Sequence, residues 1–175
     1  MTFQAGVHTA QFQSGDFPLD EYISSTVLET WRALWAGQAD LTDAIWQSWA
    51  EMVRRLNDAG VPLMAGTDLS VPGVIPGFSL HDELAIWQEV GIPAADILRS
   101  ATVVPAQFMG LSDRLGSLAE GKTASMVLLR ANPLEDVGNA RDIESVFLRG
   151  RYFDRAALDG MIEDVRESVE SAHGL

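Results

Sequence analysis

The chain has 175 residues, enough for one domain with a hydrophobic core. Acidic side chains outnumber basic ones by 25 to 12, and the resulting net charge of -13 makes nucleic acid and anionic membranes poor partners. The absence of cysteine excludes disulfides and thiolate metal sites, so only His, Asp or Glu side chains could hold a metal.

Residues 1–20 contain Gly, Ser, Asp and Pro without a clear period, which predicts a loop with a short strand near residues 3–8. This start lacks the basic residues and continuous apolar stretch of a secretory signal, which favours the cytoplasm unless the true N-terminus lies elsewhere. Further along, no apolar run reaches the roughly 20 residues that a membrane helix needs. We therefore expect no membrane partner.

Two helices are predicted next. Apolar residues recur at helical spacing over residues 18–36, and again from a cap at Asp40 or Thr42 to the stop at Gly60. The tryptophans also have helical spacing and are expected to pack in the core or on a barrel face: Trp31, Trp35, Trp46, Trp49 and Trp87.

A short apolar run follows the second helix. Residues 61–67 predict a buried strand, and Asp68 stands at its C-terminal end. Helix, tight turn, buried strand and terminal carboxylate together are typical of the active face of an α/β barrel. The Pro/Gly-rich residues 69–78 are expected to shape a pocket rim. The alternative is that Asp68 only ends a strand and caps a turn.

The second half of the chain begins with helices. They are expected over residues 79–91, where Ser79 and Asp82 suggest a capping box, and over residues 92–101 and 104–110. Short strands joined by turns then follow within residues 115–148, with a turn at Arg149-Gly150. The acidic, regularly spaced residues 154–173 predict a terminal amphipathic helix.

Several short segments carry a family resemblance through their order and spacing over about half the chain, although none is specific alone. These segments are Ala59-Gly-Val-Pro-Leu-Met-Ala-Gly-Thr-Asp68, Leu80-His-Asp-Glu-Leu84, Gly91-Ile-Pro93, Ala101-Thr102 with Pro105-Ala106, Leu115-Gly-Ser117, Glu120-Gly-Lys-Thr-Ala124, Asn132-Pro-Leu134 and Val146-Phe-Leu-Arg-Gly150. Together, residues 60–150 resemble the C-terminal third of the amidohydrolase superfamily, especially its imidazolonepropionase-like and prolidase-like branch.

The resemblance implies an α/β fold: part of a (β/α)8 TIM barrel, followed by part of a small β-sandwich. The last strand-helix units of the barrel would occupy residues 1–112, the C-terminal strands of the small β domain residues 113–153, and the terminal helix residues 154–175. It also implies a metal-dependent hydrolase of carbon–nitrogen bonds in small amides or dipeptides, with one or two divalent metal ions, of which zinc is the expected identity.

By the same resemblance, Asp68 corresponds to the aspartate that ends the eighth barrel strand, binds metal and accepts a proton from the hydrolytic water. His81 could face the carboxylate or carbonyl of the substrate, or it could serve only as a surface or capping residue. Glu83 is interpreted as a carboxylate that complements the helix dipole. His8 could be a remnant of a site, although nothing around it supports this, and His173 is expected to be solvated.

Other ligands of the family are missing from this sequence. The family supplies a His-x-His pair, a lysine and two further histidines before the aspartate, whereas this chain has three histidines and no His-x-His. One carboxylate cannot hold a catalytic zinc, which takes about three protein ligands. In the β region, Ala124-Ser125 replaces the usual Ala-Asp.

Two readings of the function follow. The chain could be the C-terminal part of an enzyme whose remaining ligands come from the rest of the barrel or from another copy. It could instead be a truncated paralogue or split subunit that serves only as an assembly or interaction module. An independent small enzyme would need a complete site, which these residues do not offer.

We predict that the isolated chain is marginally stable, because the edge of the 61–67 strand would lack partners. Thermal unfolding followed by circular dichroism tests this expectation. A cooperative transition with a high midpoint would contradict it.

Overall fold

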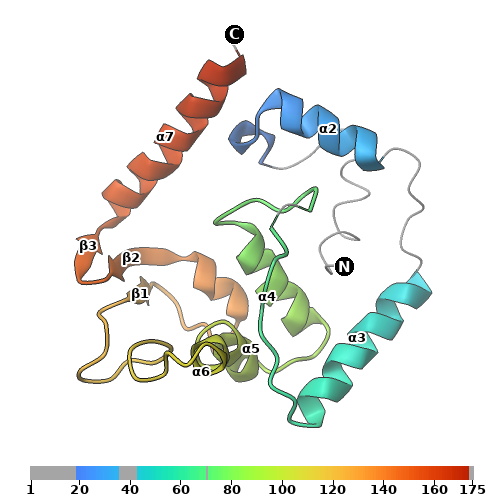
Figure 1. The fold of residues 1–175 in the computed structure, drawn as a ribbon, viewed down its shortest axis with the longest axis vertical. Coiled ribbons are helices and arrows are strands. Elements are labelled where there is room, and N and C mark those ends of the chain that lie inside the picture. The colour runs from blue at the N-terminus through green and yellow to red at the C-terminus, as the bar shows by residue number, and fades with distance from the viewer. Residues whose placement is uncertain (1–18, 36–42, 70, 174–175) are drawn as a thin grey trace.

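The computed structural model describes residues 19–35, 43–69 and 71–173 (Figure 1). The expected strand near residues 3–8, His8, and the caps Asp40 and Thr42 lie outside the described residues. Within these ranges, seven helical segments precede or interrupt a small sheet, and one long helix follows it. In chain order the helical elements are η1 (Asp20–Tyr22), α2 (Ser25–Trp35), α3 (Asp43–Asp58), α4 (Ser79–Glu89), α5 (Ala94–Ser100), α6 (Val103–Phe108), η2 (Val137–Arg141) and α7 (Arg155–His173).

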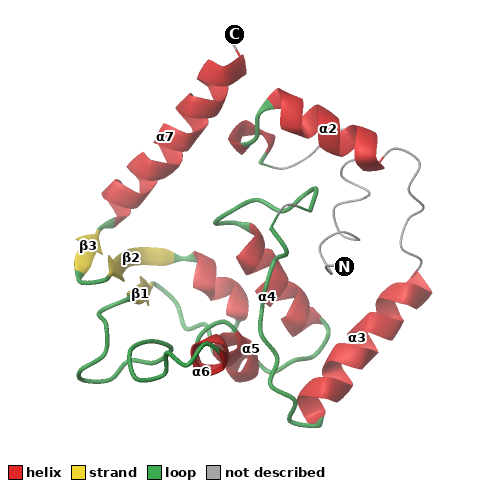
Figure 2. Ribbon diagram, in the orientation of Figure 1, coloured by secondary structure: helices red, strands yellow, loops and turns green. Residues whose placement is uncertain are grey.

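Helix α4 lies in the middle of the described structure, with α5 and α6 beside it and α3 along one side (Figures 1 and 2). Its buried face belongs to a core that also takes residues from α3, α5 and η2. Ile97 of α5 is fully buried in this core, and Trp87 of α4 is 6% exposed. The buried members of the cluster are Ala50, Val53, Leu84, Trp87, Val90, Ile92, Ile97 and Val137.

The start of α4 differs from the predicted capping box. The N-cap position is Phe78, whose side chain makes no capping hydrogen bond, and Ser79 already lies inside the first turn. The hydroxyl of Ser79 instead accepts a hydrogen bond of 2.8 Å from the backbone amide of Ile75. Asp82 forms an ion pair with Arg141. Ser79 therefore bonds to the preceding loop and Asp82 to η2, in place of the capping roles predicted from the sequence.

The 61–67 segment is not a strand in the described structure. It is irregular, and among its described backbone contacts the amide of Ala65 donates to the carbonyl of Ser100 at 3.2 Å. Leu63 and Ala65 still pack against the central core, as the apolar pattern predicted. A strand requires a neighbouring backbone to complete its hydrogen bonds, and the described residues place none beside this segment.

The small β region predicted after Gly110 is a three-stranded antiparallel sheet in the order β1-β2-β3. Its strands are β1 (Met126–Leu129), β2 (Ile143–Leu148) and β3 (Arg151–Phe153). Arg149 and Gly150 form the predicted turn between β2 and β3, with φ angles of 52° and 82°. Positive φ at both positions matches the twist of a two-residue hairpin. Residues 115–122, predicted to contribute short strands, form loops and turns instead.

The β region is joined to the helical region through η2. The backbone amide of Val137 donates to the side-chain oxygen of Gln88 in α4 at 2.7 Å, and Val137 itself is buried in the central core. From β3 the chain enters α7, which extends away from the sheet toward η1 (Figure 1). None of the helices in the described ranges has the length and apolar character required to cross a membrane.

Gly116 marks a close contact between the loop after Gly110 and helix α6. Its φ angle is 88°, and a Cβ atom at this position would lie 2.6 Å from the Cβ of Ala106 and 3.0 Å from the carbonyl oxygen of Thr102. Gly121 has a similar φ angle of 84°, but no heavy atom lies within 4 Å of the corresponding Cβ position. A side chain at Gly121 would therefore meet only backbone strain, whereas one at Gly116 would meet backbone strain and a steric clash.

We predict that Gly116→Ala destabilises the chain more than Gly121→Ala. Both variants carry the cost of a left-handed alanine, about 1–2 kcal/mol, and only Gly116→Ala adds overpacking of about 1–3 kcal/mol. Urea unfolding of the two variants and the parent measures the difference. Equal destabilisation by the two substitutions would show that the loop does not pack on α6.

Candidate functional site

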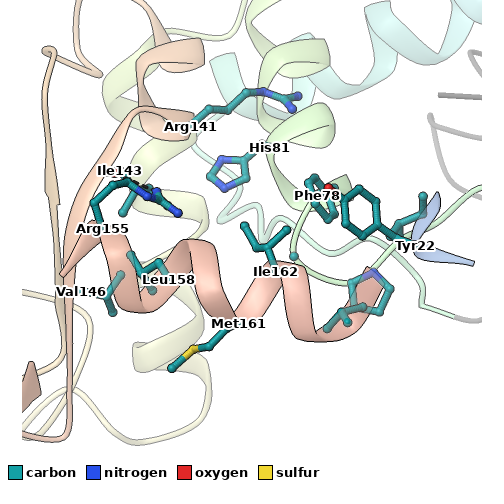
Figure 3. Close-up of a pocket in the computed structure, with 14 residues that line it drawn as sticks. Tyr22, Phe78, His81, Arg141, Ile143, Val146, Arg155, Leu158, Met161 and Ile162 are labelled. Carbon is teal, nitrogen blue, oxygen red and sulfur yellow. Dashed lines mark hydrogen bonds between the residues drawn. The ribbon is translucent and has the colours of Figure 1, made fainter. Parts of the chain in front are cut away.

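A cavity of about 650 Å³ lies between α4, α7, β2 and the loop that precedes α4 (Figure 3). We call it the α4–α7 pocket. Most of its wall is apolar, and Ile143, Phe78 and Ile162 come from three different parts of the chain. Its lining residues are Tyr22, Ile75, Pro76, Gly77, Phe78, His81, Arg141, Ile143, Val146, Arg155, Leu158, Met161, Ile162 and Val165.

His81 reaches this pocket from the first helical turns of α4, so the structure places this predicted site residue at a cavity (Figure 3). The side chain is half-buried, and no residue in the described ranges hydrogen-bonds to its Nδ1 atom. Burial lowers the pKa of His81 from 6.5, the nearby Arg141 lowers it further, and Asp82 partly opposes the shift. The imidazole is therefore mainly neutral at pH 7 and can donate one hydrogen bond and accept another.

Two arginines complete the polar part of the pocket. Arg141 in η2 forms an ion pair with Asp82 of α4. Arg155 at the start of α7 donates to the carbonyl oxygen of Ile143 at 3.0 Å and pairs with Asp159 at 2.8 Å. The Nε atom of Arg155 is buried and has no hydrogen-bond partner among the described residues. These contacts fix both guanidinium groups at the edge of an apolar cavity.

Asp68 lies in an exposed turn, and it is absent from the lining of the α4–α7 pocket. Its φ angle is 55°, and its carbonyl oxygen accepts a hydrogen bond of 3.1 Å from the amide of Val71. Left-handed backbone is unusual for a residue with a side chain, although aspartate tolerates it better than most. The described structure therefore does not bring Asp68 and His81 into one cavity.

The described residues do not form a complete metal site. Nowhere in residues 19–35, 43–69 and 71–173 do three or more His, Asp or Glu side chains gather closely enough to hold a metal ion. Asp68 can offer one carboxylate, and a catalytic zinc requires about three protein ligands. We therefore derive no chemical step from a metal held by this part of the chain alone.

Glu83 is a buried carboxyl group that sequence reasoning assigned to the helix dipole. Its exposed fraction is only 5%. Burial raises the pKa of Glu83, while the backbone amide of Gly66 and the indole of Trp87 partly oppose that shift. The Nε1 atom of Trp87 nevertheless has no hydrogen-bond partner of ordinary geometry among the described residues, so its influence is weak.

Helical spacing could have revealed the burial of Glu83. Ser79, Glu83 and Trp87 are four residues apart along α4 and share its buried face. Trp87 was already assigned to the core from the sequence, and Glu83 stands one turn before it. His81 is displaced by about 200° around the helix from Glu83, which explains why one side chain enters the core and the other reaches the pocket.

Comparison with known proteins gives the family. The sequence profile described as the amidohydrolase family matches residues 39–152, more than half of the 175 residues. The chain belongs to this family. The match includes Asp68, His81, Glu83 and the β region as far as Tyr152. The resemblance read from the short sequence segments is confirmed.

The curated relatives are imidazolonepropionases. The protein from Deinococcus deserti is 39% identical over 85 residues, which cover 48% of this chain and 21% of the relative. The protein from Thermoplasma acidophilum is 30% identical over 89 residues, which cover 48% of this chain and 20% of the relative. The chain thus spans about a fifth of the length of the curated relatives that it matches.

Solved structures agree with an amidohydrolase fold. A prolidase complexed with N-methylphosphonate-L-proline is 26% identical, with a TM-score of 0.57, and the match covers 89% of this chain and 38% of that protein. A bottromycin amidohydrolase has a TM-score of 0.70 at 24% identity over 85% of this chain and 34% of that protein. At that identity the second likeness shows the fold alone.

We predict that Glu83→Gln gains stability relative to the parent as pH rises. The pKa of Glu83 is raised in the folded chain, so folding favours the protonated acid. The stability that this preference contributes is fully present below the unfolded pKa of about 4.3. It is lost as pH rises through the folded pKa, whereas glutamine stays neutral. Urea unfolding at pH 4.5 and pH 8 measures the change.

The exposed Glu89 on the same helix provides the control, because Glu89→Gln removes one negative charge outside the core. The Glu83→Gln effect should exceed that of Glu89→Gln at pH 8. A difference between Glu83→Gln and the parent that stays constant from pH 4.5 to pH 8 would count against a buried carboxylate.

Proposed function

We propose that this chain is the C-terminal portion of a metal-dependent hydrolase that cleaves carbon–nitrogen bonds in small amides or dipeptides. The observation that carries the proposal is the amidohydrolase family match over residues 39–152. The names of the relatives point to the same chemistry, because they include imidazolonepropionases and a prolidase with a bound phosphonate analogue. We propose further that residues 61–67 form the last strand of a (β/α)8 barrel completed by polypeptide outside the described residues.

The backbone of the 61–67 segment supports that barrel assignment. Leu63 and Ala65 pack against the core, while Val61 and Met64 remain exposed. Few backbone groups of the segment have partners among the described residues. Parallel strands beside the segment would complete those hydrogen bonds. Asp68 would then stand at the carboxyl end of a barrel strand, where the active sites of such enzymes are found. The boundaries at residues 112 and 153 remain part of this proposal.

In this enzyme, Asp68 is assigned to accept the proton of the attacking water and to contribute one carboxylate to a metal site. Its exposure leaves the carboxylate accessible to water and to ligands from elsewhere. The remaining donors would come from outside the described residues, and zinc suits a site of histidine and carboxylate ligands. A metal in such a site makes bound water more acidic.

His81 is assigned to contact the substrate. Its neutral imidazole can donate a hydrogen bond to a carboxylate or carbonyl oxygen, and its position in the α4–α7 pocket makes it accessible to a small molecule. This role does not require His81 to move a proton. It is therefore a binding role, separate from the proton transfer assigned to Asp68. Because the described residues do not place Asp68 and His81 in one cavity, the proposal requires one substrate to reach both side chains in the completed barrel.

The second candidate is a non-catalytic assembly or interaction module. The observation that favours it is the lack of a group of three metal-ligating side chains in the described part of the chain. The two candidate functions differ in whether further polypeptide must supply metal ligands. A hydrolase requires a partner polypeptide, or a further segment of the same protein, with the missing metal ligands, whereas a module does not.

We predict that Asp68→Asn lowers kcat/KM by about 100-fold or more, the usual contribution of a general base. Asparagine also tolerates left-handed backbone, so the loss would reflect the missing charge and not strain at φ 55°. The assay follows hydrolysis of dipeptides and of the imidazolonepropionase substrate, with zinc supplied, by the chain together with the polypeptide that completes the barrel.

Asp113→Asn is the matched control, because Asp113 is exposed and lies outside the pocket lining. It should leave the rate unchanged. Full activity in Asp68→Asn would remove Asp68 from the mechanism. No hydrolysis by the parent in any completed form would favour the module.

A further inference from the structure

The α4–α7 pocket combines an apolar wall with basic side chains. Phe78, Ile75 and the exposed face of α7 form the wall. The cationic or basic side chains in the lining are His81, Arg141 and Arg155, and Tyr22 adds a neutral phenol. Among the described residues, no aspartate or glutamate lines this pocket. In a chain with a net charge of -13, this cavity gathers two guanidinium groups and an imidazole.

Two nitrogen atoms at this pocket lack partners. Nδ1 of His81 and Nε of Arg155 are both buried, and neither has a hydrogen-bond partner among the described residues. A buried donor without a partner costs about 1–3 kcal/mol. Both atoms are shielded as they stand, so a small turn of either side chain toward the cavity would let an oxygen-bearing ligand remove that cost. The carboxylates that pair with the arginines, Asp82 and Asp159, do not line the cavity and leave this side open.

We propose that the α4–α7 pocket binds a small organic anion with an apolar body, of the arylalkyl carboxylate class. The carboxylate would accept hydrogen bonds at the His81 and Arg155 end, and the apolar body would lie along Phe78 and Ile162 (Figure 3). A volume of about 650 Å³ suits such a ligand, since small-molecule sites span roughly 300–1,000 Å³. The inference deepens the substrate-contacting role assigned to His81 and rests on that part of the proposed function.

The first test compares three probes that share one apolar body. Isothermal titration calorimetry would measure binding of 4-phenylbutyrate, its neutral amide 4-phenylbutanamide, and the cationic 4-phenylbutylamine to the parent chain. We expect 4-phenylbutyrate to bind at least about tenfold more tightly than the amide, since hydrogen bonds to charged groups are the stronger ones, and the amine to bind least. Equal affinity of the acid and the amide, or no binding of the acid, would overturn the proposal.

The second test places a carboxylate in the wall. Ile162→Asp should abolish 4-phenylbutyrate binding, because it adds a negative charge beside the ligand; Ile162 is 39% exposed, so the change spares the core. Val165→Asp repeats the test at another exposed lining position, 50% exposed, should Ile162→Asp fail to fold. Ser168→Asp is the matched control, with the same added charge on an exposed α7 residue outside the lining.

Two further variants distinguish this inference from the proposed hydrolysis. His81→Phe keeps a flat ring and removes the nitrogen atoms, so it should reduce the preference for the acid over the amide. Asp68→Asn should leave 4-phenylbutyrate binding unchanged, since Asp68 does not line the pocket. Unchanged acid preference in His81→Phe, or retained binding in a folded Ile162→Asp chain, would overturn the pocket assignment, whatever Asp68→Asn does to hydrolysis.

Discussion

The packing of helix α4 against α5 and η2 is the interaction on which the rest of the structure depends. Trp87 and Ile97 meet in the central core, and the amide of Val137 reaches back to the side chain of Gln88. Burying side chains of this size contributes about 1.5–3 kcal/mol each. The contact holds together a helical region and a β region that are separated by more than forty residues in the sequence. Without it, β2 and the start of α7 would have no fixed relation to α4.

The position of α4 also explains how neighbouring residues acquire different chemistry. Glu83 lies on the core face, where burial favours its protonated form, and His81 lies on the opposite side, at the cavity under α7. The ion pair between Arg141 and Asp82 fixes the orientation of η2 on the same helix. A single helix therefore supplies a buried acid, a neutral imidazole and an anchor for a cationic side chain.

Backbone hydrogen bonding sets the second constraint. Within residues 61–67, Leu63 and Ala65 pack on the core while Val61 and Met64 are exposed. A strand also needs partners for its amides and carbonyls. The described residues provide the contact from Ala65 to Ser100 and no adjacent strand. The chain spans about a fifth of its curated relatives, and a barrel closes only when all its strands are present. Membership of the amidohydrolase family and an irregular 61–67 segment are therefore compatible.

The sequence by itself determined the family, the approximate positions of the α-helices but not of η2, and the turn at Arg149-Gly150. Helical periodicity, glycine stops and motif order are local properties of the chain. The sequence did not determine the burial of Glu83, the use of Asp82 by Arg141, or the cavity around His81. Those features arise from segments far apart in the sequence, such as those that bring Tyr22 and Val165 to one cavity, and only the folded chain sets such distances. The strand at residues 61–67 was predicted from side chains alone, whereas its formation depends on backbone partners that side-chain patterns do not report.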